Sequence, residues 1–329
     1  MTGNVQEFIG GIRLGEVQSF KGVTMWPLFA DQSGGVTYVT LGEALEQGFL
    51  RVTEVSEGGS VPELAVLNEG DVHVLLLDGE ELRGAKQNRM LNTSILLKPH
   101  SKTIIPVSCT EQGRWSYASR EFSDSGVVMA REVRAKKAAA VSGSLRAGAG
   151  YASDQGEVWD DIAMYSRKLS APSPTSAMRD VFAAREKDLD DFQAAFRLVD
   201  GQQGLLVALD GRVAGVDLLS SPAAFARLFP KLVKSYAMDA LANDKRSETP
   251  SAGIDVAQAF LDAAGKCVAS THRSRGAGED VRLEGQEVVG SALVVEGCVI
   301  HLALFRREKR SRGDEGSMAG WAQRRRNHG

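Results

Sequence analysis

Short apolar runs alternate with polar blocks throughout residues 72–115, a pattern typical of short strands joined by turns. The run from Val72 to Leu77 ends in Asp78-Gly79, a turn signal because glycine tolerates the positive φ that a two-residue hairpin requires. Two more strands are predicted at residues 93–97 and 103–108. The segment therefore predicts antiparallel β-structure.

The rest of the chain mixes strand and helix signals. Thr40 and Glu43 fit a capping box, in which a hydroxyl and a carboxylate each satisfy a free backbone N–H at a helix start. Pro27 and Pro106 lie in strand-like runs, where a residue without an N–H donor favours an edge or a strand end. Asp210-Gly211 predicts another hairpin. Helices are predicted at residues 127–141, 155–169, 175–198, 222–241 and 254–264, and a mobile loop at 142–150.

These elements predict an α+β fold, mostly antiparallel β-structure with inserted helices. We expect one interleaved domain over residues 1–307, with a β-rich part at 8–115, a helical insert at 122–200 and an α/β return at 204–305. The late strands, at 281–305, are expected to join the same sheet system as residues 50–108.

An internal likeness raises the question of a repeat. The segment Leu77–Ala85 resembles Leu283–Ser291, and Leu209–Gly215 shares part of the pattern. Three hairpins of similar geometry would explain the likeness without a common origin. A duplicated β-unit would explain it too, and it predicts matching strand partners for the first two segments.

Composition is that of a soluble globular protein, with 43% hydrophobic and 25% charged residues. A net charge of −3 and a pI of about 6.0 give no general attraction to nucleic acid or to an anionic membrane. We find no signal-peptide pattern, and no apolar run approaches the roughly 20 residues of a spanning helix. Three widely spaced cysteines are typical of reduced thiols, so a cytoplasmic location is expected. The basic residues 308–329 are expected to form a disordered tail, either a solvated end or a nucleic-acid contact.

A first polar cluster follows the turn at Asp78-Gly79 and could bind a phosphorylated ligand. Lys86 and Arg89 could hold phosphate, arginine through its two-pronged guanidinium. Gln87 and Asn88 could orient a ribose or a base edge. The alternative is a solvated hairpin turn whose charges pair internally. The cluster consists of Glu80, Glu81, Lys86, Gln87, Asn88 and Arg89, with Glu81 as a candidate proton carrier.

A second polar cluster consists of Ser108, Cys109, Glu111, Arg114 and Trp115. Arg114 and Trp115 could clamp an anion beside an aromatic face. Glu111 could act as a general base if burial raises its pKa. The spacing from Cys109 to Arg114 is one residue short of the Cys-x5-Arg phosphatase loop, so we reject that mechanism and expect Cys109 to be a small buried residue. We expect both clusters to line one cavity.

Metal and cofactor sites have little support in the sequence. The five histidines are scattered along the chain. Cys298 and His301 are three residues apart in a strand-like run, where they would face opposite sides. We find no nucleotide-binding glycine fingerprint. The sequence therefore predicts no metal site and identifies no cofactor.

Several segments together resemble a prokaryotic family, the ARG and rhodanese-phosphatase-superfamily-associated protein domain, where ARG means ADP-ribosylglycohydrolase. The likeness rests on VTYVTLGEAL at residues 36–45, RVTEV at 51–55, DGEELRGAKQNR at 78–89, PVSCTEQGRW at 106–115 and QGEVW at 155–159. Weaker likeness continues to residue 305. The resemblance implies a genomic link to enzymes that handle ADP-ribose and NAD-derived nucleotides, and it implies no catalytic residues.

Two functions fit these observations. The first is a cytoplasmic protein that binds or processes ADP-ribose or a related phosphorylated nucleoside in NAD-linked metabolism. Its ligand-binding residues would be Lys86, Gln87, Asn88, Arg89, Arg114 and Trp115, and Glu81 or Glu111 would move protons. The second is a non-catalytic homo-oligomeric assembly protein that uses the same clusters as its subunit interface.

Overall fold

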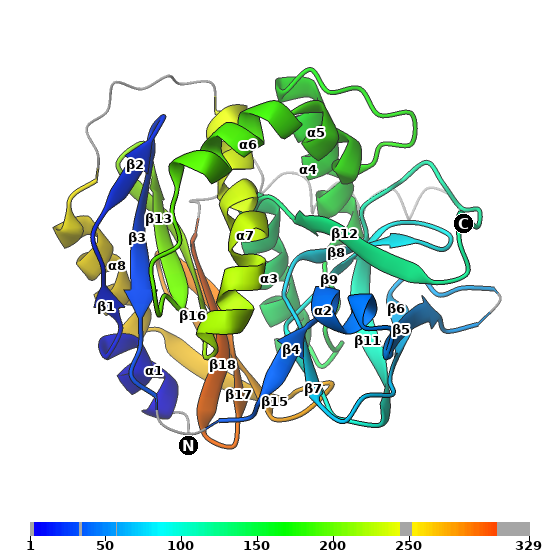
Figure 1. Cartoon of the computed structure of the whole chain (residues 1–329), viewed down its shortest axis with the longest axis horizontal. Coiled ribbons are helices and arrows are strands. Elements are labelled where there is room, and N and C mark those ends of the chain that lie inside the picture. Colours follow the sequence, from blue (N-terminus) through cyan, green and yellow to red (C-terminus); the bar gives the residue numbers. More distant parts are fainter. Residues whose placement is uncertain (1–2, 33–34, 57, 244–251, 308–329) are drawn as a thin grey trace, which may run out of the picture.

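The computed structural model describes residues 3–32, 35–56, 58–243 and 252–307. It confirms an α+β protein in which mostly antiparallel sheets combine with helices that lie between and around them (Figure 1). A nine-stranded sheet lies beside a pair of smaller sheets. Among the described helices, none combines the length and the hydropathy that a bilayer-spanning segment needs. The tail expected at residues 308–329 lies outside the described residues.

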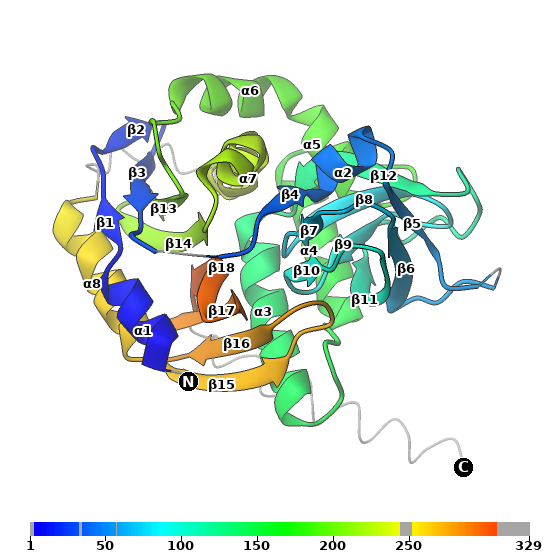
Figure 2. The same ribbon diagram turned by 60° about the horizontal axis from the view of Figure 1, so that its bottom comes forward.

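The nine-stranded sheet combines strands from both ends of the described chain. Its order is β1-β3-β13-β14-β18-β17-β16-β15, and β2 also pairs with β3. Apolar side chains cover both faces: α1 (Gly3–Gly10) and α8 (Ile254–Gly265) pack on one, and α7 (Pro222–Ala242) packs on the other (Figure 2). The strands are β1 (Arg13–Leu14), β2 (Gln18–Phe20), β3 (Val23–Phe29), β13 (Gly204–Leu209), β14 (Arg212–Leu219), β15 (Val268–Arg273), β16 (Glu279–Glu284), β17 (Val288–Val295) and β18 (Cys298–Arg306).

The smaller sheets come from the segment between β3 and the first long helix, and they share one apolar core. A six-stranded sheet has the order β12-β8-β9-β11-β6-β5, and a three-stranded sheet the order β10-β7-β4. The edge strands β12 and β5 contact each other, and α2 (Leu41–Glu46) contacts both, so the six-stranded sheet is rolled. The strands are β4 (Tyr38–Thr40), β5 (Leu50–Glu54), β6 (Glu63–Asn68), β7 (His73–Leu76), β8 (Glu80–Gly84), β9 (Arg89–Leu91), β10 (Ile95–Leu97), β11 (Ser101–Cys109) and β12 (Phe122–Val128).

Two expectations about strand pairing are wrong. The turn at Asp78-Gly79 does not close a hairpin, because β7 belongs to the three-stranded sheet and β8 to the six-stranded one. Asp210-Gly211 does join paired strands, β13 and β14. The late strands β16 to β18 pair through β14 with the nine-stranded sheet and not with the sheets of residues 50–108. The segments 77–85 and 283–291 therefore have different strand partners, which removes the argument for a duplicated β-unit.

The helices follow the local signals with some changes. Thr40 and Glu43 form the predicted capping box of α2, and the helix predicted at 155–169 is α4 (Gln155–Lys168). The helix predicted from Thr175 is two helices, α5 (Met178–Ala184) and α6 (Glu186–Ala195), and Thr175 instead donates to Glu111. The loop expected at 142–150 begins later, because α3 (Arg131–Arg146) continues through its first half.

Pro27 and Pro106 lie inside strands and not at edges or ends, and the pairing explains why they are tolerated. On one side of β3, the pairing with β2 ends at Met25 and the pairing with β1 begins at Leu28, so Pro27 falls in the gap. Pro106 is the last β11 residue paired with β6, and the next residue pairs with β9. Each proline therefore sits where its strand changes partner.

Helix α3 carries three buried cations between the two bodies of β-structure (Figure 2). They form the ion pairs Arg131–Asp239, Arg134–Asp217 and Lys137–Asp78. Arg134 donates to both oxygens of Asp217 on β14, at 3.0 and 2.5 Å, and its guanidinium lowers the pKa of that carboxyl to about 2 against the effect of burial. Lys137 binds Asp78 between β7 and β8. These three basic side chains therefore face inward, and Arg134 and Lys137 join the two bodies.

Candidate functional site

The two polar clusters meet where β9 and β11 pair. Arg89 and Cys109 are cross-strand partners, and Arg89 Nη1 lies 3.0 Å from Cys109 Sγ. The Asn88 N–H donates to Glu111 Oε2 at 3.2 Å, and Arg114 Nη2 donates to Asn88 Oδ1 at 3.3 Å. Segments about twenty residues apart in sequence are therefore in direct contact.

Arg114 forms hydrogen bonds to several groups of the protein itself. Its guanidinium donates to both oxygens of Glu111, at 3.0 and 2.6 Å. It also donates to the carbonyl oxygens of Ala85 at 2.6 Å and Ser116 at 2.9 Å. Through these hydrogen bonds, Arg114 connects the turn after β8 to the loop after β11.

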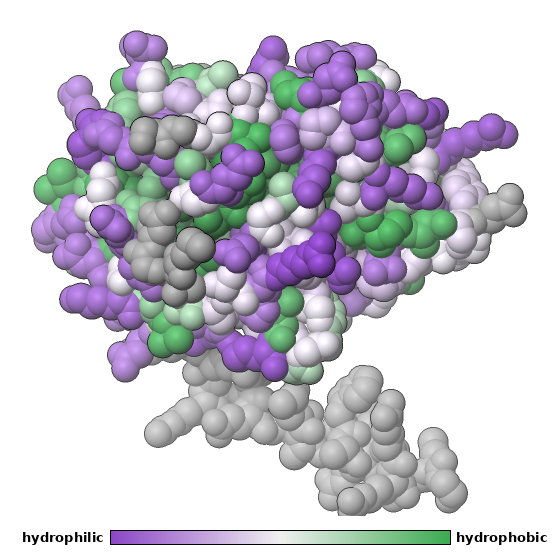
Figure 3. Space-filling model, turned by 90° about the horizontal axis from the view of Figure 1, so that it is seen from below, coloured by the Kyte–Doolittle hydropathy of each residue, from purple (hydrophilic) through white to green (hydrophobic). Residues whose placement is uncertain are grey.

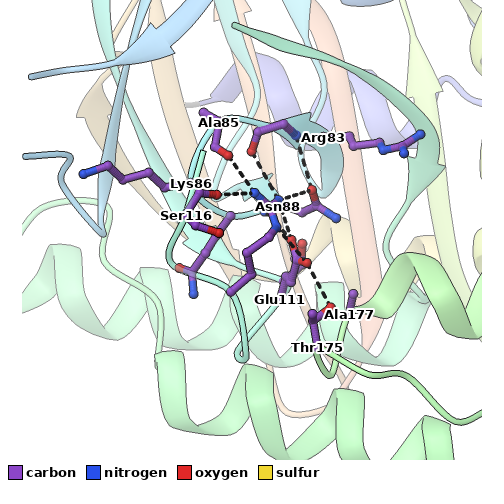
Figure 4. A network of polar contacts seen from close by, with 12 residues as sticks. Arg83, Ala85, Lys86, Asn88, Glu111, Ser116, Thr175 and Ala177 are labelled. Carbon is purple, nitrogen blue, oxygen red and sulfur yellow. Dashed lines mark hydrogen bonds and ion pairs between the residues drawn. The ribbon is translucent and has the colours of Figure 1, made fainter. Parts of the chain in front are cut away.

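Glu111 accepts a set of hydrogen bonds that favours its ionised form. Burial raises its pKa, but the bonds from Arg114, Thr175 Oγ1 and the Asn88 N–H outweigh that effect and lower the pKa below its usual value. Figure 4 shows its carboxylate between Asn88 and Thr175. The general-base role required a raised pKa, so the condition on which that expectation rested is not met.

Glu81 lies on the other face of the sheet from Arg89. In the pairing of β8 with β9, Glu81 is opposite Met90 while Arg89 is opposite Leu82. Successive residues of a strand face opposite sides, so Glu81 and Arg89 are separated by the sheet. Burial raises the pKa of Glu81 to about 7, against the hydrogen bond of 2.6 Å from Thr110 Oγ1. The structure therefore separates Glu81 from Arg89 but places it near Glu111, whose charge contributes to the raised pKa of Glu81.

Arg89 is a fully buried cation on the interior face of the rolled sheet. Its face is shared by Leu82 and Leu91, which belong to the apolar core. Nη1 donates to Gln87 Oε1 at 2.8 Å and to the Cys109 thiol, both neutral groups. Nε and Nη2 are buried and have no hydrogen-bond partner within the described part of the chain. The guanidinium therefore keeps two buried donors that no described residue satisfies.

Trp115 is a half-exposed aromatic residue next to this guanidinium. The indole is 49% exposed, and Arg89 Cζ is 5.6 Å from the ring centroid. Lys86 Nζ lies 5.3 Å from the same ring and donates to the carbonyl oxygen of Gly58 at 2.7 Å. Figure 4 shows the Lys86 side chain extending away from the Arg114 network. An aromatic surface with two nearby cations therefore marks this end of the sheet.

Glu54 belongs to the same place and was not singled out by the sequence. Its Oε1 accepts from the Lys86 N–H at 3.4 Å, and its Oε2 is buried without a hydrogen-bond partner among the described residues. A Cβ added to Gly59 would lie 3.5 Å from this Oε2 and 3.5 Å from the Trp115 ring. A signal was available: Leu50, Val52 and Glu54 alternate along β5, which places a charge at an inward position. We call Glu54, Lys86, Gln87, Arg89, Cys109 and Trp115 the Arg89 site.

The remaining cluster residues have structural partners. Cys109 is buried, and burial raises the pKa of its thiol, which agrees with the expectation of a packed residue. Ser108 faces the other way and donates to Asn92 Oδ1 at 2.6 Å. Glu80 is buried and pairs with Lys231 at 2.7 Å.

Within the described ranges, no group of three or more His, Cys, Asp or Glu side chains is arranged to hold a metal ion.

Comparison with known proteins places the chain by family. Comparison with curated proteins found no match, and comparison with solved structures found none. A family model for the ARG and Rhodanese-Phosphatase-superfamily-associated Protein domain matches residues 11–305, which span both bodies of β-structure and the helices between them. The chain belongs to the ARG and Rhodanese-Phosphatase-superfamily-associated Protein domain family.

Proposed function

We propose that this protein binds ADP-ribose or a related phosphorylated nucleoside at the Arg89 site. One observation carries the proposal: Arg89 is buried, has no ion pair among the described residues, and keeps two donors without partners. A buried charge without a counter-ion destabilises a protein by about several kcal/mol. Two oxygens of a phosphate would satisfy Nε and Nη2 together, since a guanidinium presents them as a fork.

The neighbouring side chains suit the rest of such a ligand. The half-exposed ring of Trp115 offers a stacking face for a base, and Lys86 supplies a second positive charge near that face. Gln87 holds Arg89 in place through Nη1. Asn88 and Arg114 act as support, because both are tied to Glu111. The family's association with ADP-ribosylglycohydrolases makes ADP-ribose the first ligand to test.

The proposal is for binding without an assigned reaction. Glu81 and Glu111 stay candidates for moving protons: hydrogen-bond donors lower the pKa of Glu111, and Glu81, with a pKa of about 7, lies across the sheet from Arg89. A location in the cytoplasm and a role in NAD-linked metabolism belong to the same proposal. They rest on the family association and on composition.

The test is calorimetric titration with ADP-ribose, NAD and AMP, followed in parallel by tryptophan fluorescence. Wild-type protein should bind at least one ligand, and Arg89→Met, which keeps the apolar volume, should lose binding while remaining folded. Arg83→Met is the matched control, since Arg83 is exposed and its side chain points away from the network (Figure 4). No heat with any of the three ligands at millimolar concentration would reject the proposal, as would unchanged binding by Arg89→Met.

A second candidate is an assembly role for the same surface. It is favoured by two aromatic rings that are half-exposed side by side near Lys86, Trp115 at 49% and Tyr117 at 53%. Light scattering distinguishes an assembly role from a ligand-binding role. If the surface is a subunit interface, wild type is an oligomer that Trp115→Ala dissociates. Under the ligand proposal, Trp115→Ala leaves the molecular mass unchanged and weakens nucleotide binding.

A further inference from the structure

Among the described residues, one oxygen of Glu54 lacks a hydrogen-bond donor, two nitrogens of Arg89 lack hydrogen-bond acceptors, and both side chains belong to the Arg89 site. Arg89 has two buried donors without partners, and Glu54 has one buried acceptor oxygen without a partner, both judged within the described residues. They do not form an ion pair with each other in the described chain. Both act on the thiol of Cys109: beyond the effect of burial, Arg89 lowers its pKa and Glu54 raises it. Arg89 contacts this thiol directly, and Glu54 lies near enough to act on it through its charge.

We infer that Glu54 is the specificity-determining residue of the Arg89 site, and that the ligand carries a ribose-type vicinal diol as well as an anionic group. This inference rests on the proposed function. An ionised carboxylate only accepts hydrogen bonds, so Glu54 requires a donor, and a bare phosphate brings none and repels it. Two adjacent hydroxyls can donate to one carboxylate, the arrangement by which acidic residues hold ribose in dinucleotide-binding folds.

The surroundings of Glu54 fix its orientation toward the ligand side. The Lys86 N–H holds Oε1, which leaves Oε2 for a second donor. Gly59 has φ of +76° and no side chain, and a Cβ there would lie 3.3 Å from Lys86 Cδ and 3.5 Å from Oε2 of Glu54. Glycine at residue 59 therefore places no side chain against Oε2 of Glu54.

The experiment compares AMP with 2′,3′-dideoxy-AMP as competitors of ADP-ribose, using the full chain. Wild type should prefer AMP by about 10- to 100-fold, the range expected for a hydrogen-bonded charge. In Glu54→Ala this ratio should fall to about one. In Glu54→Gln, which keeps the shape and loses the charge, the ratio should fall and inorganic pyrophosphate should compete better. Glu46→Gln, an exposed position on α2, should behave as wild type.

The outcomes separate the two proposals. If wild type does not distinguish the two competitors while Arg89→Met abolishes ADP-ribose binding, the diol inference is overturned and the proposed function stands. An unchanged ratio in Glu54→Ala also overturns the inference. If wild type binds no nucleotide, both fall. Circular dichroism of each variant shows whether a loss of binding comes from unfolding.

Discussion

Arg114 holds Glu111 with two hydrogen bonds, Nε to Oε1 at 3.0 Å and Nη2 to Oε2 at 2.6 Å. The side chains are only 17% and 7% exposed, so this pair is screened much less than a surface ion pair. The same guanidinium bonds the carbonyl oxygens of Ala85 and Ser116. Removal of Arg114 would leave a partly buried carboxylate and two carbonyl groups without their donor.

We therefore expect Arg114→Ala to lower the free energy of unfolding by about 3 kcal/mol. Arg114→Lys should recover part of this loss, since an ammonium keeps the charge but not the fork. Urea denaturation measures both, with the exposed Arg83→Ala as a control expected within about 0.5 kcal/mol of wild type. A loss below about 1 kcal/mol for Arg114→Ala would contradict a stabilising role for these hydrogen bonds.

The buried carboxyl of Glu81 should make stability depend on pH. Its pKa is raised from 4.5 to about 7, so the folded protein binds more protons than the unfolded protein between these values. The free energy of unfolding should therefore decrease as pH rises from 4.5 to 7, by at most about 3 kcal/mol from this group. Denaturant titrations across this range should show the decrease in wild type and a smaller one in Glu81→Gln.

The pKa of Glu111 is shifted in the opposite direction to that of Glu81, so its effect on stability should appear in a different pH range. Its pKa is lowered from 4.5, so its stabilising contribution is complete above pH 4.5 and is lost as the pH falls below that value. Glu111→Gln should therefore change the pH dependence only at acidic pH, where wild type loses stability more steeply than the variant. If both variants change the profile in the same pH range, the assignment of these two carboxyls is wrong.

The ion pair between Arg134 and Asp217 should show how burial changes the energetics of a charge pair. Both side chains are fully buried, so Arg134→Met removes the cation and leaves the Asp217 carboxylate with Tyr236 and His301 as its neighbours. This should cost about 3–5 kcal/mol. Arg51 and Glu69 form a pair at 2.7 Å in which each side chain is 48% exposed. Arg51→Met should cost less than about 1 kcal/mol. Equal losses by thermal or urea unfolding would contradict the buried network between α3 and β14.

Gly79 and Gly126 form a matched pair of substitutions. Both have positive φ, +78° and +76°, so alanine strains the backbone to a similar extent at either position. A Cβ at Gly79 would lie 2.8 Å from the Arg134 side chain, whereas a Cβ at Gly126 meets nothing within 4 Å. Gly79→Ala should therefore be more destabilising than Gly126→Ala, by about 1–3 kcal/mol for the forced contact. Similar losses would mean that Arg134 can move aside.

Local signals along the chain were sufficient to predict much of the secondary structure. The capping box at Thr40 and the hairpin at Asp210-Gly211 each depend on a few adjacent residues, and both are present. Sheet membership could not be predicted in the same way. Asp78-Gly79 carries the same dipeptide as the hairpin, but Asp78 binds Lys137 from a distant helix, and the chain there passes from one sheet to another. A contact of that sequence separation has no local signature.

The candidate site shows the same division between local and long-range information. The meeting of the two clusters follows from the pairing of β9 with β11, as expected from two neighbouring strands with polar ends. Which residues share a face was not predictable. Arg89 is eight positions after Glu81, an even spacing that would give one face in a single strand. The turn between β8 and β9 shifts the alternation, so that Leu82 is the residue opposite Arg89.

The nine-stranded sheet has a consequence for how the chain folds during synthesis. Strand β14 at residues 212–219 pairs with β18 at residues 298–306, so its edge has no native partner until almost all of the described chain has left the ribosome. The rolled sheet, by contrast, uses only residues 50–128 and has all its strands much earlier. A translating ribosome should therefore display a β-rich intermediate whose unfinished apolar edge depends on chaperones or on rapid elongation for protection.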